Sequence, residues 1–89
     1  MKAVVTVVGK DRTGIIARVS GLLYQNGINI LDIAQTIMQD IFTMITLIDT
    51  TNSSLDFAEL KTELEKVGEE LGVAITLQHE DLFNSMHRI

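Results

Sequence analysis

The chain of 89 residues contains no cysteine. Without thiols it can form no disulfide bond, no thiolate-bound zinc site and no thiolate nucleophile, and it suits a reducing compartment. Long apolar runs are missing too, because none approaches the roughly 20 residues that cross a membrane, and no signal-peptide pattern precedes the first apolar segment. The sequence therefore predicts a cytoplasmic protein with no membrane partner.

Aromatic residues and positive charges are scarce. Three phenylalanines and one tyrosine, with no tryptophan, are too few for a sheet that stacks RNA bases. Seven lysines and arginines stand against twelve aspartates and glutamates, and the resulting net charge of -5 repels a phosphate backbone. We therefore expect no nucleic-acid partner.

The hydrophobic residues, 46% of the chain, follow a regular order in its first half. The β-branched run at 4–8 predicts a buried strand. A stripe at helical spacing follows, and Gly27 marks its end because glycine readily adopts the left-handed conformation found there. The stretches 28–38 and 41–49 predict a hairpin in which Asp40 is left-handed, unless the loop is longer than two residues. The helical stripe consists of Ile15, Ile16, Val19, Leu22 and Leu23.

The second half of the sequence predicts a helix and a strand. Ser53 and Ser54 are expected to open the helix, with Asp56 completing a capping box behind Ser53, and Gly72 to close it. Alternation over 73–78 predicts an edge strand with one buried face. Residues 80–89 carry apolar side chains at helix-like spacing. The stripe of the second helix consists of Phe57, Leu60, Leu64, Val67 and Leu71.

The order β-α-β-β-α-β predicts an α+β, ferredoxin-like fold, a four-stranded antiparallel sheet with two helices on one face. One domain covers 1–79, and a short C-terminal amphipathic helical tail covers 80–89. The strand 41–49 has apolar residues on both sides: Phe42, Met44 and Ile48 on one, Ile41, Ile45 and Leu47 on the other. Since the helices cover only one face, the other needs the tail or a second subunit. We expect a homodimer or a higher homo-oligomer, because a core this small favours association.

The segment 9–15 is the most informative part of the sequence. It delivers a charged pair to the N-terminus of a helix, where free backbone N–H groups and the positive end of the helix dipole suit a carboxylate or another small anion. Gly14 has no side chain, so a ligand can approach the first turn closely. The loop contains no nucleophile and no obvious base, which indicates binding before chemistry.

These residues resemble a known family, the ACT domain, a regulatory module that senses amino acids and other small metabolites. The resemblance rests on Gly9-x-Asp11-Arg12-x-Gly14-Ile15 after the first strand, and on Asn29-Ile30-x-Asp32 and Gln35-Thr36 in the second. It covers the chain to about Leu77, and the tail resembles that of small stand-alone bacterial ACT proteins. It implies a regulatory protein that has no catalytic activity, cofactor or metal and that can act on a protein partner. The ligand-binding residues it implies are Gly9, Asp11, Arg12, Thr13, Gly14, Ile15, Asn29, Ile30 and Asp32.

We expect the ligand, an amino acid, to lie between the loop 9–15 and the strand entrance 29–32, at a subunit boundary. N–H groups near Thr13 and Gly14, helped by Arg12, are expected to take its carboxylate. Asn29 and Asp32 are expected to take its amino group. A Gly14→Val substitution should then block the site at a modest cost in stability.

Plainer roles remain open for the same side chains. Asp11 can cap the first helix by accepting a backbone N–H group. Arg12 can be a solvated side chain. Asp32 can form an ion pair with Arg12 or Arg18, since a carboxylate in a strand does not serve packing.

Two other functions remain open. The chain can be a protein-interaction or dimerisation module whose ligand site is vestigial. It can also be a small acylphosphatase-like enzyme, because that family is similar in length, in element order and in using a first-loop arginine and a sheet asparagine; its loop pattern is not matched by residues 10–13. A metal site from His79, Glu80, Asp81 and His87 would require the tail to fold back, and we expect none.

Overall fold

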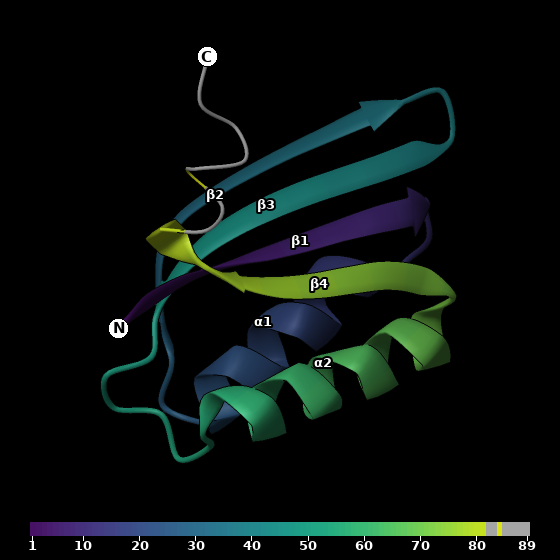
Figure 1. Ribbon diagram of the computed structural model, residues 1–89. Helices are drawn as coiled ribbons and strands as arrows, with labels where there is room; N and C mark the ends of the chain where they lie inside the picture. Colours follow the sequence, from purple (N-terminus) through teal and green to yellow (C-terminus); the bar gives the residue numbers. More distant parts are fainter. Residues whose placement is uncertain (82–83, 85–89) are drawn as a thin grey trace.

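A computed structural model describes residues 1–81 and 84 of the chain. The strands β1 (Lys2–Lys10), β2 (Asn29–Met38), β3 (Ile41–Asp49) and β4 (Val73–His79) form one antiparallel sheet in the order β2-β3-β1-β4. The helices α1 (Ile15–Gln25) and α2 (Phe57–Leu71) lie on one face of that sheet (Figure 1). The predicted ferredoxin-like fold is confirmed. Most of the predicted tail, residues 82–83 and 85–89, lies outside the described residues.

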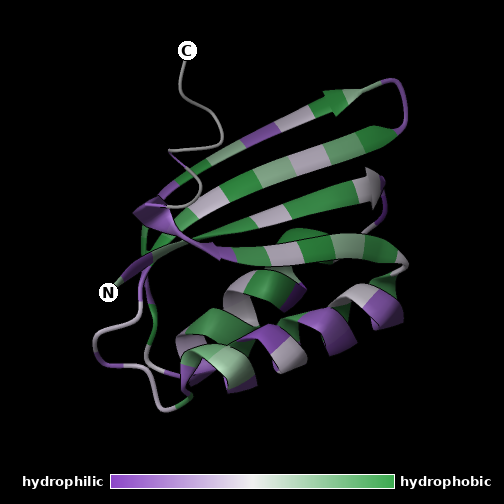
Figure 2. Ribbon diagram, viewed as in Figure 1, coloured by the Kyte–Doolittle hydropathy of each residue, from purple (hydrophilic) through white to green (hydrophobic). Residues whose placement is uncertain are grey.

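The hydrophobic core lies between the sheet and the two helices. The central strand β1 contributes Val5 and Val7, both 0% exposed, and α2 contributes Leu60 and Leu64. Hydrophilic residues of α2 occupy the side turned away from the sheet (Figure 2). None of the helices described is long and apolar enough to cross a membrane.

The turn between β2 and β3 differs from its prediction. Gln39, not Asp40, has the positive φ, 60°. Met38 pairs with Ile41, so the loop has the two residues expected, and its first residue adopts the left-handed conformation. The carbonyl of Asp40 instead accepts a hydrogen bond from the backbone N–H of Asp11, at 2.8 Å.

The start of α2 also differs. The capping box consists of Asp56 and Glu59: Asp56 Oδ1 accepts from the N–H of Glu59 at 2.8 Å, and Glu59 Oε1 accepts from the N–H of Asp56 at 3.0 Å. Ser53 belongs to the preceding loop, where its hydroxyl accepts from the N–H of Leu55. The helix therefore begins at Phe57, and it ends at Gly72 with φ 71°, as predicted.

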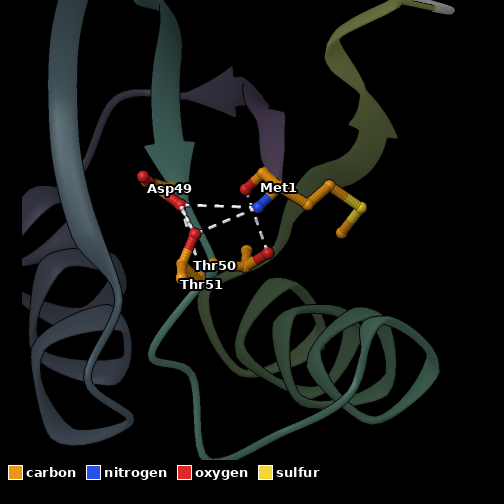
Figure 3. A network of polar contacts seen from close by, with 4 residues as sticks. All are labelled: Met1, Asp49, Thr50 and Thr51. Atoms are coloured by element: carbon orange, nitrogen blue, oxygen red, sulfur yellow. Dashed lines mark hydrogen bonds and ion pairs between the residues drawn. The ribbon is translucent and has the colours of Figure 1, made fainter.

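Polar contacts connect the start of β1 to the end of β3 (Figure 3). The amino group of Met1 lies 3.6 Å from Asp49 Oδ1 and donates to the hydroxyl of Thr51. Asp49 Oδ1 also accepts from the hydroxyl and the N–H of Thr51, and these hydrogen bonds lower the pKa of the Asp49 carboxyl. The carbonyl of Met1 accepts from the N–H of Thr50 at 2.8 Å.

Two surfaces of the sheet carry exposed apolar residues. The predicted division of β3 is confirmed, since Phe42, Met44 and Ile48 are buried under the helices and Ile41 and Ile45 are exposed on the other face. On β2, every residue except the half-buried Ile30 is exposed. The helices therefore leave one face of the sheet and one edge strand uncovered.

A candidate ligand site at the N-terminus of α1

The loop between β1 and α1 is held from two sides. On one side the N–H of Asp11 donates to the carbonyl of Asp40 in the β2–β3 turn. On the other side Arg12 Nη1 donates to the carbonyl of Leu71 at 2.8 Å, which satisfies a backbone oxygen at the C-terminal end of α2. Arg12 is exposed, but it is not a free ligand clamp, because Nη1 of its guanidinium group joins the loop to α2.

The first turn of α1 has no side-chain cap. Gly14 is the N-cap residue, with φ 92°, so Asp11 does not have the capping role considered for it. The first helical hydrogen bond runs from the N–H of Arg18 to the carbonyl of Gly14, at 2.9 Å. The N–H groups of Ile15, Ile16 and Ala17 precede that bond, as the donors at a helix start do, and they remain available to an anion.

Gly14→Val is not a clean test of ligand binding, because it would also affect the stability of the fold. A Cβ atom at this position would meet no atom within 4 Å, so the space in front of the turn is open. The positive φ is, however, strained for any L side chain and most of all for a β-branched one. Gly14→Val would therefore destabilise the fold substantially, and the modest cost expected from the sequence is wrong.

A cavity of about 230 Å³ opens beside this turn. Its polar groups come from the loop and from Gln35 on β2, and its apolar walls from α1, β2 and β3. Gln35 belongs to the sequence pattern behind the resemblance, but sequence reasoning did not place it in the site. Of the apolar lining it found Ile15 and missed Ile16, Ala17, Ile37 and Phe42. The lining residues are Asp11, Arg12, Gly14, Ile15, Ile16, Ala17, Gln35, Ile37 and Phe42.

Several residues predicted to bind the ligand pack within the fold or lie outside the cavity. A Cβ atom on Gly9 would lie 2.6 Å from Val73 Cγ1, so glycine there allows β1 and β4 to pack closely. Ile15 is 2% exposed in the core, although it also borders the cavity, and Ile30 packs against the same core. Thr13 is exposed in the loop and does not line the cavity.

Asn29 and Asp32 lie far from the loop within one chain. Asn29 pairs with Asp49 at the end of the sheet where β1 begins, whereas Ile37, at the cavity, pairs with Phe42 at the opposite end. Eight residues of extended strand separate Asn29 from Ile37, roughly 26 Å. A single chain therefore does not bring the two predicted anchors together.

The ion pair considered for Asp32 is not formed. Asp32 Oδ1 accepts the N–H of Ile33 at 2.9 Å. Arg12 bonds the Leu71 carbonyl, and Arg18 forms a two-pronged ion pair with Glu70, at 2.8 and 2.9 Å. The carboxylate of Asp32 is exposed on β2.

The histidine considered for metal binding has an aromatic neighbour. The ring of His79 stacks on Phe57 with centroids 4.3 Å apart and planes inclined by 6°. In the part of the chain that the structure describes, no three His, Cys, Asp or Glu side chains gather as metal ligands would. His87 lies outside the described residues.

The chain belongs to the ACT-domain family, whose sequence profile matches residues 2–78. It is similar to a UPF0237 protein of the archaeon Methanocaldococcus jannaschii, with 59% identity over 99% of this chain and 98% of the relative. The expected restriction to bacteria is therefore too narrow.

Solved structures agree with this assignment. An ACT domain protein from Streptococcus pneumoniae superposes with a TM-score of 0.81 and 43% identity, over 93% of each chain. A putative glycine cleavage system transcriptional repressor superposes with a TM-score of 0.75 and 30% identity, over 86% of this chain and 44% of the repressor.

Proposed function

We propose that this protein is a cytoplasmic, non-catalytic regulatory module that binds an amino acid at the N-terminus of α1. The observation that carries the proposal is an uncapped helix start that opens into a cavity with both a carboxylate and apolar walls. Membership of the ACT family and similarity to a putative transcriptional repressor support a regulatory role. An amino acid needs these three features, because it has an anionic end, a cationic end and a side chain.

The ligand lies with its carboxylate against the N–H groups of Ile15, Ile16 and Ala17, at the positive end of the helix dipole. Its ammonium group faces the carboxylate of Asp11. Its side chain packs against Ile37, which is 55% exposed and so has surface left to bury.

A second copy of the chain completes this site. β2 is an edge strand with almost every residue exposed, no proline and a single charged residue, Asp32, so little prevents it from pairing with another strand. Antiparallel pairing of two β2 strands about Ala34 would place Ile33 of one copy opposite Gln35 of the other, on the face of the sheet that carries the cavity. The second copy then extends the apolar wall of the site, whereas Asp32 lies on the opposite face of the sheet and does not reach the ligand.

A thermal-shift screen with the twenty amino acids tests the proposal. A ligand at 100 times its dissociation constant adds about 2.7 kcal/mol to the free energy of unfolding, and the melting temperature rises accordingly. Ala17→Leu should abolish the response by filling the cavity from the helix, and Asp11→Asn should weaken it. Glu65→Gln, exposed on α2, is the matched control and should leave it unchanged.

The second candidate function is an assembly module whose ligand site is vestigial, acting on a protein partner. The exposure of β2 favours assembly whether or not a ligand binds. Absence of any thermal shift, combined with a stable homodimer, would select this function over amino-acid sensing.

A further inference from the structure

The cavity at the N-terminus of α1 has charged side chains only in the loop that precedes the helix. Asp11 and Arg12 belong to that loop, and they are the two charged residues among those that line the cavity. Nη1 of Arg12 donates to the carbonyl of Leu71 at 2.8 Å, so this part of the guanidinium group is already engaged. In the proposed function, Asp11 faces the ammonium group of the ligand. The walls formed by α1, β2 and β3 therefore offer no charge to the side chain of a ligand.

Those walls carry apolar surface that is open to solvent. Ile16 on α1 is 37% exposed, and Ile37 on β2 is 55% exposed. Ile37 pairs with Phe42 of β3, which is buried and also lines the cavity. A ligand side chain placed here contacts a helix and a strand at once. The free energy it gains grows with the apolar area that it removes from water.

Gln35 is the one uncharged polar side chain among the residues that line the cavity. It is exposed on β2, so water reaches its amide group in the free protein. A hydroxyl or carboxamide on the ligand would exchange its hydrogen bonds to water for this single partner, and a charged group would meet no opposite charge. Polar and charged side chains therefore gain less from these walls than apolar ones.

We propose that the ligand is an amino acid with a large apolar side chain, such as valine, leucine or methionine. The inference rests on the proposed function, which assigns the contacts of the carboxylate and the ammonium group. Those contacts are the same for every amino acid, so selection among amino acids depends on the walls around the side chain. In the proposed homodimer, Ile33 of the second copy lies opposite Gln35 and adds apolar surface, since it is 43% exposed in one chain.

Isothermal titration calorimetry with isosteric amino acids tests the inference. Threonine has the shape of valine with a hydroxyl in place of a methyl group, and asparagine has the shape of leucine with a carboxamide in place of the branched methyl groups. We expect valine and leucine to bind about 10–100 times more tightly than these polar isosteres, as in other apolar pockets. Equal or tighter binding of the polar isosteres, or of a charged amino acid, overturns the inference and leaves the proposed function intact. Binding of none of the twenty amino acids overturns the proposed function itself.

Ile37→Ser tests the apolar wall directly. Ile37 is half-exposed on an edge strand, so the variant should fold, which circular dichroism verifies. It should raise the dissociation constant of leucine about tenfold relative to that of alanine, whose methyl side chain has little surface to lose. The ratio of the two constants separates this loss from any weakening of the homodimer, which affects both ligands equally.

Ile41→Ser is the matched control for this variant. Ile41 is 48% exposed on the same hairpin but on the opposite face of the sheet, so its substitution should leave the ratio unchanged. An unchanged ratio in Ile37→Ser overturns the proposal, and so does an equal change in both variants.

Discussion

On the face of the sheet that carries the helices, the half around β1 is covered and the half around β2 is exposed, although the two strands have similar sequences. Val5 and Val7 on β1 are 0% exposed, while Ile33 and Ile37 on β2 are 43% and 55% exposed. All four are β-branched residues whose side chains lie on the helix side of the sheet, so only the position of the strand relative to the helices separates them. The covered side, β1 with α2, supplies stability. The uncovered half, β2 with the start of α1, leaves apolar surface exposed, which the proposed ligand and second copy would bury.

The largest expected difference comes from shortening one isoleucine on each side. Ile48 on β3 is 0% exposed, and Ile48→Ala should lower the free energy of unfolding by about 2–5 kcal/mol at any protein concentration. Ile37→Ala removes a half-exposed side chain, so its cost should be smaller and should grow with protein concentration as dimers form. Urea unfolding of both variants over a concentration series measures this contrast, and equal, concentration-independent losses would contradict it.

Alanine substitutions of two glycines, one in each half, should change the free energy of unfolding in opposite directions. Gly72 closes α2 with φ 71°, and Gly72→Ala should cost about 1–2 kcal/mol of left-handed strain. Gly21 lies within α1, where a Cβ atom would meet nothing within 4 Å, and Gly21→Ala should add about 0.5–1 kcal/mol through helix propensity. Thermal unfolding should therefore move in opposite directions in the two variants, and a shift in the same direction would refute the reasoning.

Thr46 lies where the two sides meet, paired with Val5 on β1 and with Ile33 on β2. It is 1% exposed, and within residues 1–81 and 84 its hydroxyl has no hydrogen-bond partner. Thr46→Val should raise the free energy of unfolding by about 1 kcal/mol, because a desolvated hydroxyl is replaced by a methyl group of similar shape. Thr46→Ser, which keeps the hydroxyl and loses the methyl group, is the control and should destabilise. Stabilisation by both substitutions would contradict the assignment of the penalty to the hydroxyl.

The smallest effect concerns acid. Hydrogen bonding to Arg18 lowers the pKa of Glu70 below its ordinary 4.5, and hydrogen bonding to Thr51 lowers that of Asp49 below 3.8. A lowered native pKa stabilises the fold above the ordinary pKa, and that contribution is lost as pH falls through the native value. Stability should decline slightly below about pH 4.5, and Glu70→Gln with Asp49→Asn should flatten this part of the curve in chemical denaturation. Both pairs are exposed, so salt should reduce the effect.

The sequence was sufficient for elements defined by local patterns. The bounds of β3 and the closure of α2 at Gly72 agree with their predictions, because alternation and glycine at a helix end are local signals. The start of α2 was missed because Ser53 and Asp56 are both good caps, and only tertiary context decides which one the chain uses.

The sequence predicted the loop of the candidate site correctly. It did not predict the residues of the site that come from elements distant in the sequence. Arg12 bonds a carbonyl 59 residues away in the sequence, and no local pattern reveals such a partner. Gln35 and Ile37 join the cavity because the registers of β1, β2 and β3 place that end of β2 beside the loop. The same registers place Asn29 beside Asp49, at the end of the sheet opposite the cavity.

Nuclear magnetic resonance titration with amino acids tests the central claim most directly, namely that the uncovered side holds an amino-acid site shared by two copies. In the ¹⁵N–¹H spectrum, one amino acid should shift the amides of Ile15, Ile16 and Ala17 and, with the same dissociation constant, that of Ile33. A set of spectra in which none of the twenty amino acids shifts the α1 amides would contradict the account.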